Sequence, residues 1–117
     1  MNNQKRFKKY VLIAVAIIVE NICVKPLDDI TTGELAQQFN ISRKLLQVAF
    51  REIVGMGIKE YRNMKRMEMA QQLLADGNKS IKEIARTCLY KSQSAFTTAF
   101  KKMYGITPSE WQEHNQV

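Results

Sequence analysis

Hydrophobic side chains recur at helical spacing in two neighbouring stretches of the chain, roughly residues 32–38 and 43–54. Asn40 stands between them, and asparagine tolerates the left-handed backbone that a sharp turn needs. Ser42 is placed to cap the second helix, and Gly55 is placed to end it. The residues assigned to the buried stripe of the two helices are Leu35, Ala36, Phe39, Leu45, Leu46, Ala49, Phe50 and Ile53. The pattern predicts a helix-turn-helix, with a plain helical hairpin as the alternative.

The same pattern returns about 50 residues further along the chain. Thr31 and Glu34 are spaced as in a capping box, in which the hydroxyl and the glutamate each accept a backbone N–H, and Ser80 and Glu83 repeat this spacing. The later copy has one residue inserted between its two helices. Equivalent pairs after the insertion include Ser42/Ser92, Leu46/Phe96, Ala49/Ala99, Phe50/Phe100, Arg51/Lys101, Gly55/Gly105, Glu60/Glu110 and Tyr61/Trp111. We interpret the chain as a duplicated helix-turn-helix.

A long helix is predicted between the two copies. Residues 58–76 contain neither proline nor glycine, are rich in helix-forming residues and end at Gly77. At a rise of about 1.5 Å per residue, such a helix is about 28 Å long. The side chains assigned to its packed face are Met64, Met67, Ala70, Leu73 and Leu74. The predicted fold is therefore all-α, with two helix-turn-helix units joined by a long linker helix.

The first 25 residues combine a basic start with an apolar run. Lys5, Arg6, Lys8 and Lys9 precede a stretch without charge from 11 to 19, which is the order found in signal peptides. No small-x-small cleavage sequence follows, and the run is shorter than the roughly 20 residues that span a bilayer. We favour a buried first helix over roughly residues 7–23, with a signal peptide or a membrane anchor as the alternatives.

Composition narrows the possible functions. The 117 residues carry 18 Lys and Arg against 11 Asp and Glu, which leaves a net charge of +7. His114 is the one histidine, and Cys23 and Cys88 are too few for a four-thiolate zinc site. Both cysteines are predicted to be small buried apolar residues, with a disulfide or a redox switch as the alternative. No catalytic constellation, metal site or cofactor motif is visible, so we expect no enzyme and no cofactor, and the charge favours a polyanion as partner.

These motifs give the chain a specific resemblance. From Pro26 to Trp111 it resembles the DNA-binding domain of the AraC/XylS family of bacterial transcription regulators. The motifs that carry this likeness are Glu34-Leu35-Ala36, Ser42-Arg43, Phe50-Arg51, Tyr61-Arg62, Ser80-Ile81-x-Glu83-Ile84-Ala85 and Gly105-Ile106-Thr107-Pro108-Ser109-Glu110-Trp111. The resemblance implies about seven helices and sequence-specific transcription regulation in the cytoplasm. It implies double-stranded DNA and RNA polymerase as partners, no membrane, and a monomer unless the chain is part of a longer, dimeric protein.

The domain boundaries follow from the repeat and the resemblance. Residues 1–25 form a basic arm and first helix, 26–57 the first helix-turn-helix unit, 58–77 the linker helix and 78–117 the second unit. Residues 26–117 are expected to act as one DNA-binding domain.

The chain departs from the family pattern at three positions. Leu89 stands in the second turn, where the family usually has glycine. Val48 and Thr98 stand where family members often carry an arginine in each recognition helix. Leu89 and Thr98 favour an alternative function, a protein-interaction module derived from a DNA-binding domain with weak or non-specific DNA binding.

Candidate DNA contacts lie on the face of each second helix that the apolar stripe leaves exposed. Arg and Lys can donate to guanine, and Gln can pair with adenine, in the major groove. The predicted set is Arg43, Lys44, Gln47, Val48 and Arg51 in the first unit, and Lys91, Gln93, Ser94, Thr97, Thr98 and Lys101 in the second. Arg43 and Arg51 could as easily hold phosphates. Arg66 is expected to have a structural role.

Overall fold

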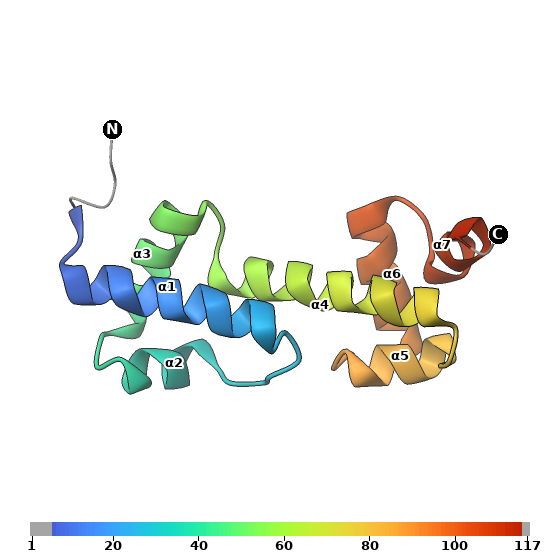
Figure 1. The fold of residues 1–117 in the computed structure, drawn as a ribbon, viewed down its shortest axis with the longest axis horizontal. Coiled ribbons are helices and arrows are strands. Elements are labelled where there is room, and N and C mark those ends of the chain that lie inside the picture. The colour runs from blue at the N-terminus through green and yellow to red at the C-terminus, as the bar shows by residue number, and fades with distance from the viewer. Residues whose placement is uncertain (1–5, 116–117) are drawn as a thin grey trace. The chain divides into compact units, whose positions relative to one another are not determined.

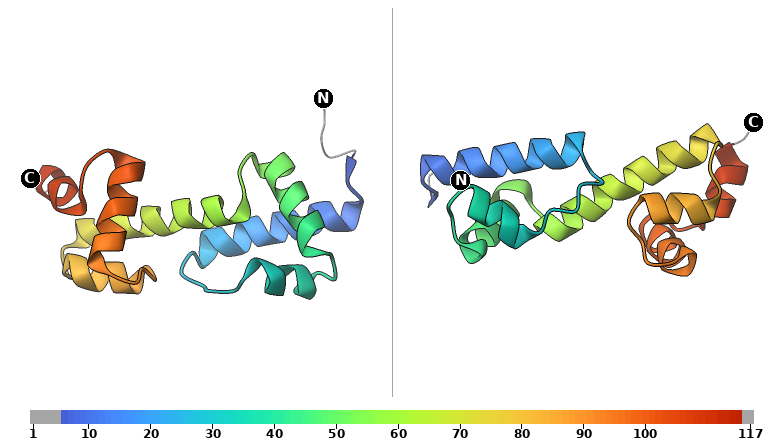
Figure 2. Two further views of the ribbon diagram at one scale, coloured as in Figure 1. Left: turned by 180° about the vertical axis from the view of Figure 1, so that it is seen from behind. Right: turned by 90° about the horizontal axis from the view of Figure 1, so that it is seen from below.

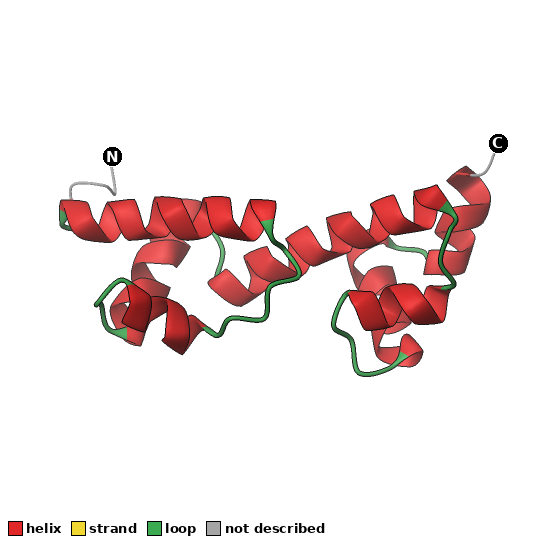
Figure 3. Cartoon of the chain, turned by 60° about the horizontal axis from the view of Figure 1, so that its bottom comes forward, coloured by secondary structure: helices red, strands yellow, loops and turns green. Residues whose placement is uncertain are grey.

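The computed structural model describes residues 6–115, which form seven helices and no strand (Figures 1 and 3). The helices are α1 (Lys9–Val24), α2 (Thr32–Gln38), α3 (Arg43–Val54), α4 (Ile58–Asp76), α5 (Ile81–Thr87), α6 (Gln93–Tyr104) and α7 (Pro108–Asn115). The all-α prediction and the two helix-turn-helix units joined by a long helix are confirmed. Lys5, part of the predicted basic arm, lies outside the described residues.

The chain divides into two compact units, residues 1–65 and 66–117. The boundary falls inside α4, so this 19-residue helix contributes its first part to unit 1 and its last part to unit 2. Each unit contains one helix-turn-helix, α2–α3 in the first and α5–α6 in the second.

The core of unit 1 forms where α1 and α2 pack against α3. The Phe50 ring is fully buried and meets the Tyr61 ring edge-on, with centroids 5.8 Å apart. The buried residues of this core are Val11, Val15, Ile18, Ile22, Leu35, Ala36, Leu46, Ala49, Phe50 and Ile58. One face of α1 is therefore part of the core, as the buried-helix interpretation predicts. Among the described residues, no helix has both the length and the apolar character needed to cross a bilayer.

The core of unit 2 is built around aromatic rings. Phe100 is fully buried and has the rings of Phe96, Tyr104 and Trp111 around it, with centroids 4.7–6.5 Å away. The last part of α4 adds a buried stripe of Met67, Ala70 and Leu74. The side-chain amide of Gln112 in α7 donates to the carbonyl of Leu74 at 3.0 Å. Unit 2 thus has a hydrophobic core of its own.

Side-chain caps fix the starts of the helices. The two predicted capping boxes form, with Glu34 and Glu83 each donating a backbone N–H to the hydroxyl of Thr31 or Ser80 at 3.1 Å. A third box at Thr107 and Glu110 begins α7. Sequence reasoning missed it, although the Thr-x-x-Glu spacing is present.

The caps also depend on the charge of their glutamates. Hydrogen bonds from Thr31 hold the pKa of Glu34 below its usual value, and Ser80 does the same for Glu83. Because these folded-state pKa values are lowered, the stabilisation is present above the unfolded pKa and is lost as the pH falls through the folded pKa.

Both cysteine thiols are free, but they differ in burial. Burial raises the pKa of the Cys88 thiol to about 11, so it stays protonated at neutral pH and packs as a small apolar residue. The prediction of burial is wrong for Cys23, which is exposed, with its Sγ 3.1 Å from the Tyr61 hydroxyl.

The turns between paired helices contain two non-glycine residues with positive φ, Asn40 at 55° and Leu89 at 69°. Both residues lie in the turns that the sequence predicts, but only asparagine tolerates this conformation well. The left-handed conformation costs an ordinary L-residue about 1–2 kcal/mol. The Leu89 side chain is 44% exposed, so little packing offsets that cost.

We expect Leu89→Gly to raise the free energy of unfolding by about 0.5–1 kcal/mol, because relief of the left-handed leucine exceeds the added chain entropy of glycine. Urea unfolding followed by circular dichroism measures the change. Asn40→Gly is the matched control and should change stability by less. A loss of stability in Leu89→Gly would show that the exposed leucine contributes more by packing than its backbone costs.

Candidate nucleic-acid interface

The exposed face of α3 carries the first predicted contact set. Ser42 starts the helix by accepting the N–H of Leu45 at 3.0 Å, and Gly55 ends it with φ at 95°. Leu46, Ala49 and Phe50 face the core, which turns the intervening side chains to solvent. All five predicted residues of this helix are exposed: Arg43, Lys44, Gln47, Val48 and Arg51.

A groove in unit 1 brings part of this set together with neighbouring elements. Arg43, Gln47 and Arg51 lie one helical turn apart and line one side of the groove. The other lining residues come from the start of α2 and the start of α4: Thr31, Thr32, Gly33, Gly57, Ile58, Lys59, Glu60 and Arg62. The groove therefore gathers the guanidinium groups of Arg43, Arg51 and Arg62, the amide of Gln47 and the ammonium group of Lys59. Lys59 is absent from the predicted contact set because it lies outside the helix-turn-helix.

Arg51 has an acidic partner in this groove. Its Nη2 lies 3.0 Å from Oε1 of Glu60, which also accepts the backbone N–H of Gly57 at 3.3 Å. The backbone N–H just before α4 therefore holds the carboxylate in place, and the carboxylate orients the guanidinium. Both side chains are exposed, so the pair adds little to stability. Its chemical effect is to offset one positive charge of the contact face.

The second predicted set surrounds the start and the exposed face of α6. Ser92 begins this helix by accepting the N–H of Ala95 at 3.1 Å, and Phe96 and Phe100 turn inward. Thr97 is half-buried. The exposed members of the set are Lys91, Gln93, Ser94, Thr98 and Lys101. Ser94, Thr97 and Thr98 give this face hydroxyls at the positions that Lys44, Gln47 and Val48 occupy on α3.

The repeated glutamate is used differently in the two units. Glu110 accepts the N–H of Thr107 at 3.0 Å, as Glu60 accepts that of Gly57. Hydrogen bonds from Thr107 hold the pKa of Glu110 below its usual value, and the charge of Lys101 lowers it further. Lys101 thus acts on its repeat-equivalent acid through its charge, whereas Arg51 donates a hydrogen bond to Glu60.

Arg66 begins the part of α4 that belongs to unit 2. It is half-buried, and its positive charge opposes the rise that burial causes in the pKa of Cys88 and of Tyr90. Arg66 therefore lies close to the core of unit 2.

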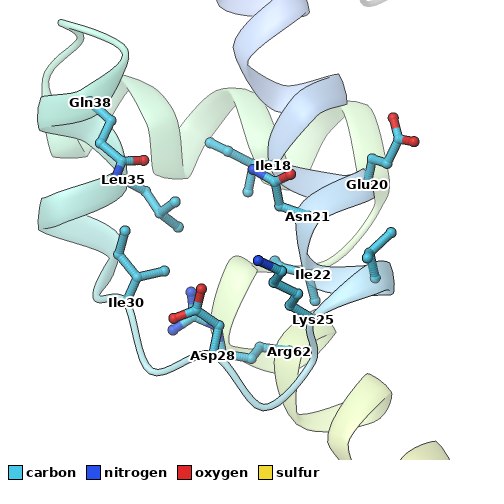
Figure 4. A pocket seen from close by; sticks show the side chains of 11 residues that line it. Ile18, Glu20, Asn21, Ile22, Lys25, Asp28, Ile30, Leu35, Gln38 and Arg62 are labelled. Atoms are coloured by element: carbon cyan, nitrogen blue, oxygen red, sulfur yellow. The ribbon is translucent and has the colours of Figure 1, made fainter.

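A separate cavity of about 340 Å³ opens between the end of α1, the following loop and α2 (Figure 4). Its apolar walls are Ile18, Ile22, Ile30 and Leu35, and charged groups of both signs line it as well. It shares only Arg62 with the groove beside α3. The cavity holds no pair of side chains arranged as nucleophile and base, and it lies outside the predicted contact set.

Comparison with known proteins agrees with this geometry. The family described as helix-turn-helix domain matches residues 35–114, a range that begins inside α2 and includes all of α3 to α6. A Streptomyces lividans protein with "AraC-like transcription regulator" in its name is 36% identical over 84 residues, covering 72% of this chain and 28% of that protein. The chain belongs to the AraC family.

Solved structures of similar proteins share the fold of this AraC-family chain. A Chromobacterium violaceum transcriptional regulator, described as containing an AraC-type DNA-binding domain, aligns with a TM-score of 0.74 at 25% identity. The alignment covers 98% of this chain and 97% of that one. A DNA-binding transcriptional dual regulator from Escherichia coli K-12 aligns with a TM-score of 0.75 at 29% identity, covering 87% and 91% of the two chains.

This AraC-family chain spans only part of the length of the curated relatives it matches, from 11% for one Bacillus subtilis regulator to 39% for one from Photobacterium leiognathi. Its likeness to them therefore concerns the two helix-turn-helix units and the helix between them.

Proposed function

We propose that this chain binds double-stranded DNA sequence-specifically and regulates transcription, with α3 and α6 as its two recognition helices. The observation that carries the proposal is the repetition of one exposed polar face. In each unit a serine-capped, glycine-ended helix buries an apolar stripe and leaves a basic or hydroxyl-bearing face in solvent. An exposed helix with such a face is what the major groove accepts.

Charge and sequence support DNA over a protein partner. The net charge is +7, and the candidate set includes Arg43, Lys44 and Arg51 on α3. Gln47 lies between them on the same exposed face and offers a donor and an acceptor for adenine. We further propose that α3 supplies most of the sequence discrimination, because the face of α6 is rich in hydroxyls that read bases less selectively.

One chain is proposed to use two successive major grooves on one side of the DNA. The two recognition helices belong to the same chain, and α4 between their units is about 28 Å long. Successive major grooves recur at about 34 Å. Because the units are tandem repeats, the site need not be the palindrome that a twofold dimer requires. Residues 26–117 would then act as one DNA-binding domain.

The test begins with selection of bound sites from random duplex DNA, followed by footprinting and stoichiometry on the selected site. We expect protection of about 20 base pairs, in two grooves, by one chain per duplex at low protein concentration. Protection of a single groove, or two chains within that length, would contradict the bipartite arrangement. Binding that never exceeds the affinity for random DNA would favour the protein-interaction alternative.

A further inference from the structure

Helix α1 has a second apolar stripe, on the side that does not face the core. Tyr10, Ile13, Ile17 and Val24 are 52%, 49%, 41% and 69% exposed. With Glu20 between the last two, they follow the alternating spacing of three and four residues that marks a coiled-coil seam. The buried side of the same helix carries Val11, Val15, Ile18 and Ile22. The two stripes thus lie on different faces of α1.

The stripe is open along the edge of unit 1. Figure 2 shows α2 and α3 on one side of α1, which is where its buried stripe packs. None of the stripe residues belongs to the candidate DNA contact set. Large apolar side chains that are contiguous and exposed mark contact surfaces more often than isolated ones do.

We infer that this stripe is the contact surface for a second copy of the chain, bound antiparallel through α1. In an isologous pair about a twofold axis near residue 15, Ile13 of each copy packs on Ile17 of the other. The same register sets Tyr10 beside Glu20 of the second copy, where the phenol can donate to the carboxylate. Lys9 lies next to Tyr10 and brings a positive charge to the same carboxylate.

The charges on α1 favour a second copy of the chain as the partner and an antiparallel arrangement of the two helices. Glu20 is the only acid of the helix, and Lys8 and Lys9 are at its opposite end. A parallel pair would place Glu20 against Glu20 and Lys9 against Lys9, and like charges at facing positions are destabilising. The antiparallel pair replaces both repulsions with opposite-charge contacts, so the surface is complementary to itself.

The pair is expected to be weak. A seam with two central apolar layers buries less than the roughly 1,200 Å² of a standard stable interface. We expect dissociation constants of about 10–100 micromolar. The surface is independent of the proposed DNA binding, since each copy keeps both of its recognition helices. If each chain binds its own two-groove DNA site, the pair would hold two such sites together.

Sedimentation velocity of the full chain without DNA, over a wide concentration range, tests the surface. The double variant Ile13→Glu/Ile17→Glu should weaken self-association about tenfold or more, because four buried carboxylates would replace the central layers. Met103→Glu is the matched control, since Met103 is 42% exposed and lies on α6. A wild-type chain that stays monomeric at millimolar concentration, or equal losses in both variants, would overturn the inference.

A charge exchange tests the direction and does not depend on the folding of the double variant. Glu20→Lys should weaken the pair, and adding Lys9→Glu should restore it, because the exchange recreates the opposite-charge contact. In a parallel pair the exchange would restore nothing. Circular dichroism melting of each variant confirms that the fold is kept. Association of the wild type that neither change affects would show that another surface is used.

Discussion

Raising the salt concentration fourfold should lower the affinity of this chain for its selected DNA site about 500-fold. The candidate contact set contains five basic side chains: Arg43, Lys44, Arg51, Lys91 and Lys101. If each neutralises one phosphate, the slope of log affinity against log salt is about −4.5, because each contact releases condensed counterions. Fluorescence anisotropy on labelled duplex, at about 50 and 200 mM salt, measures the slope.

Single substitutions identify which charges contribute. Lys101→Ala should reduce the slope by about 1, whereas Lys25→Ala, an exposed lysine at the end of α1, should leave it unchanged. Arg51→Ala should have a smaller effect than Lys101→Ala, since Glu60 already pairs with that guanidinium. Equal changes in the slope for all three variants would mean that DNA responds to the overall positive charge of the chain and not to contacts with the candidate set.

Lys44→Ala and Gln47→Ala should each weaken binding to the selected site by about 1–3 kcal/mol, with a much smaller loss on random DNA. The reason is that both side chains are exposed in the first half of α3, and the N-terminal part of a recognition helix is the part that reaches base edges. Competition binding with selected and random duplexes gives the two losses. The matched test in unit 2 is Thr98→Ala, which should change discrimination less.

Equal losses on both duplexes would make Lys44 and Gln47 backbone contacts. A larger effect from Thr98 than from Gln47 would reverse the proposed order of the two units.

Most of the fold could be predicted because the sequence signals are local. The bounds predicted for the helices at 32–38 and 58–76 agree with α2 and α4, since a cap or a glycine marks their ends. The positive φ of Leu89 could be predicted from its place in the second turn. A capping hydroxyl or a left-handed residue acts within a few positions of itself, so no knowledge of packing is needed.

Features that depend on contacts between distant residues were harder to predict. The apolar character of cysteine predicts burial of Cys23, but its side chain is exposed beside Tyr61. The pairing of Arg51 with Glu60 joins two helices across a turn, and repeat matching identified both residues without showing their contact. Exposure of the α3 face followed from periodicity, whereas the groove beside it depends on how α2 and α4 begin.

The boundary between the units falls within α4, not in a loop, and this restricts how the protein could have changed since its duplication. Modules joined by flexible segments can be exchanged between genes or cut apart by proteases with little damage to either. Here, separation between residues 65 and 66 would break a continuous ladder of helical hydrogen bonds and expose the packed residue Met67. A cut there would therefore damage both units, and the two copies have diverged within one continuous structure, by one inserted residue and by the substitutions that separate the charged face of α3 from the hydroxyl-rich face of α6.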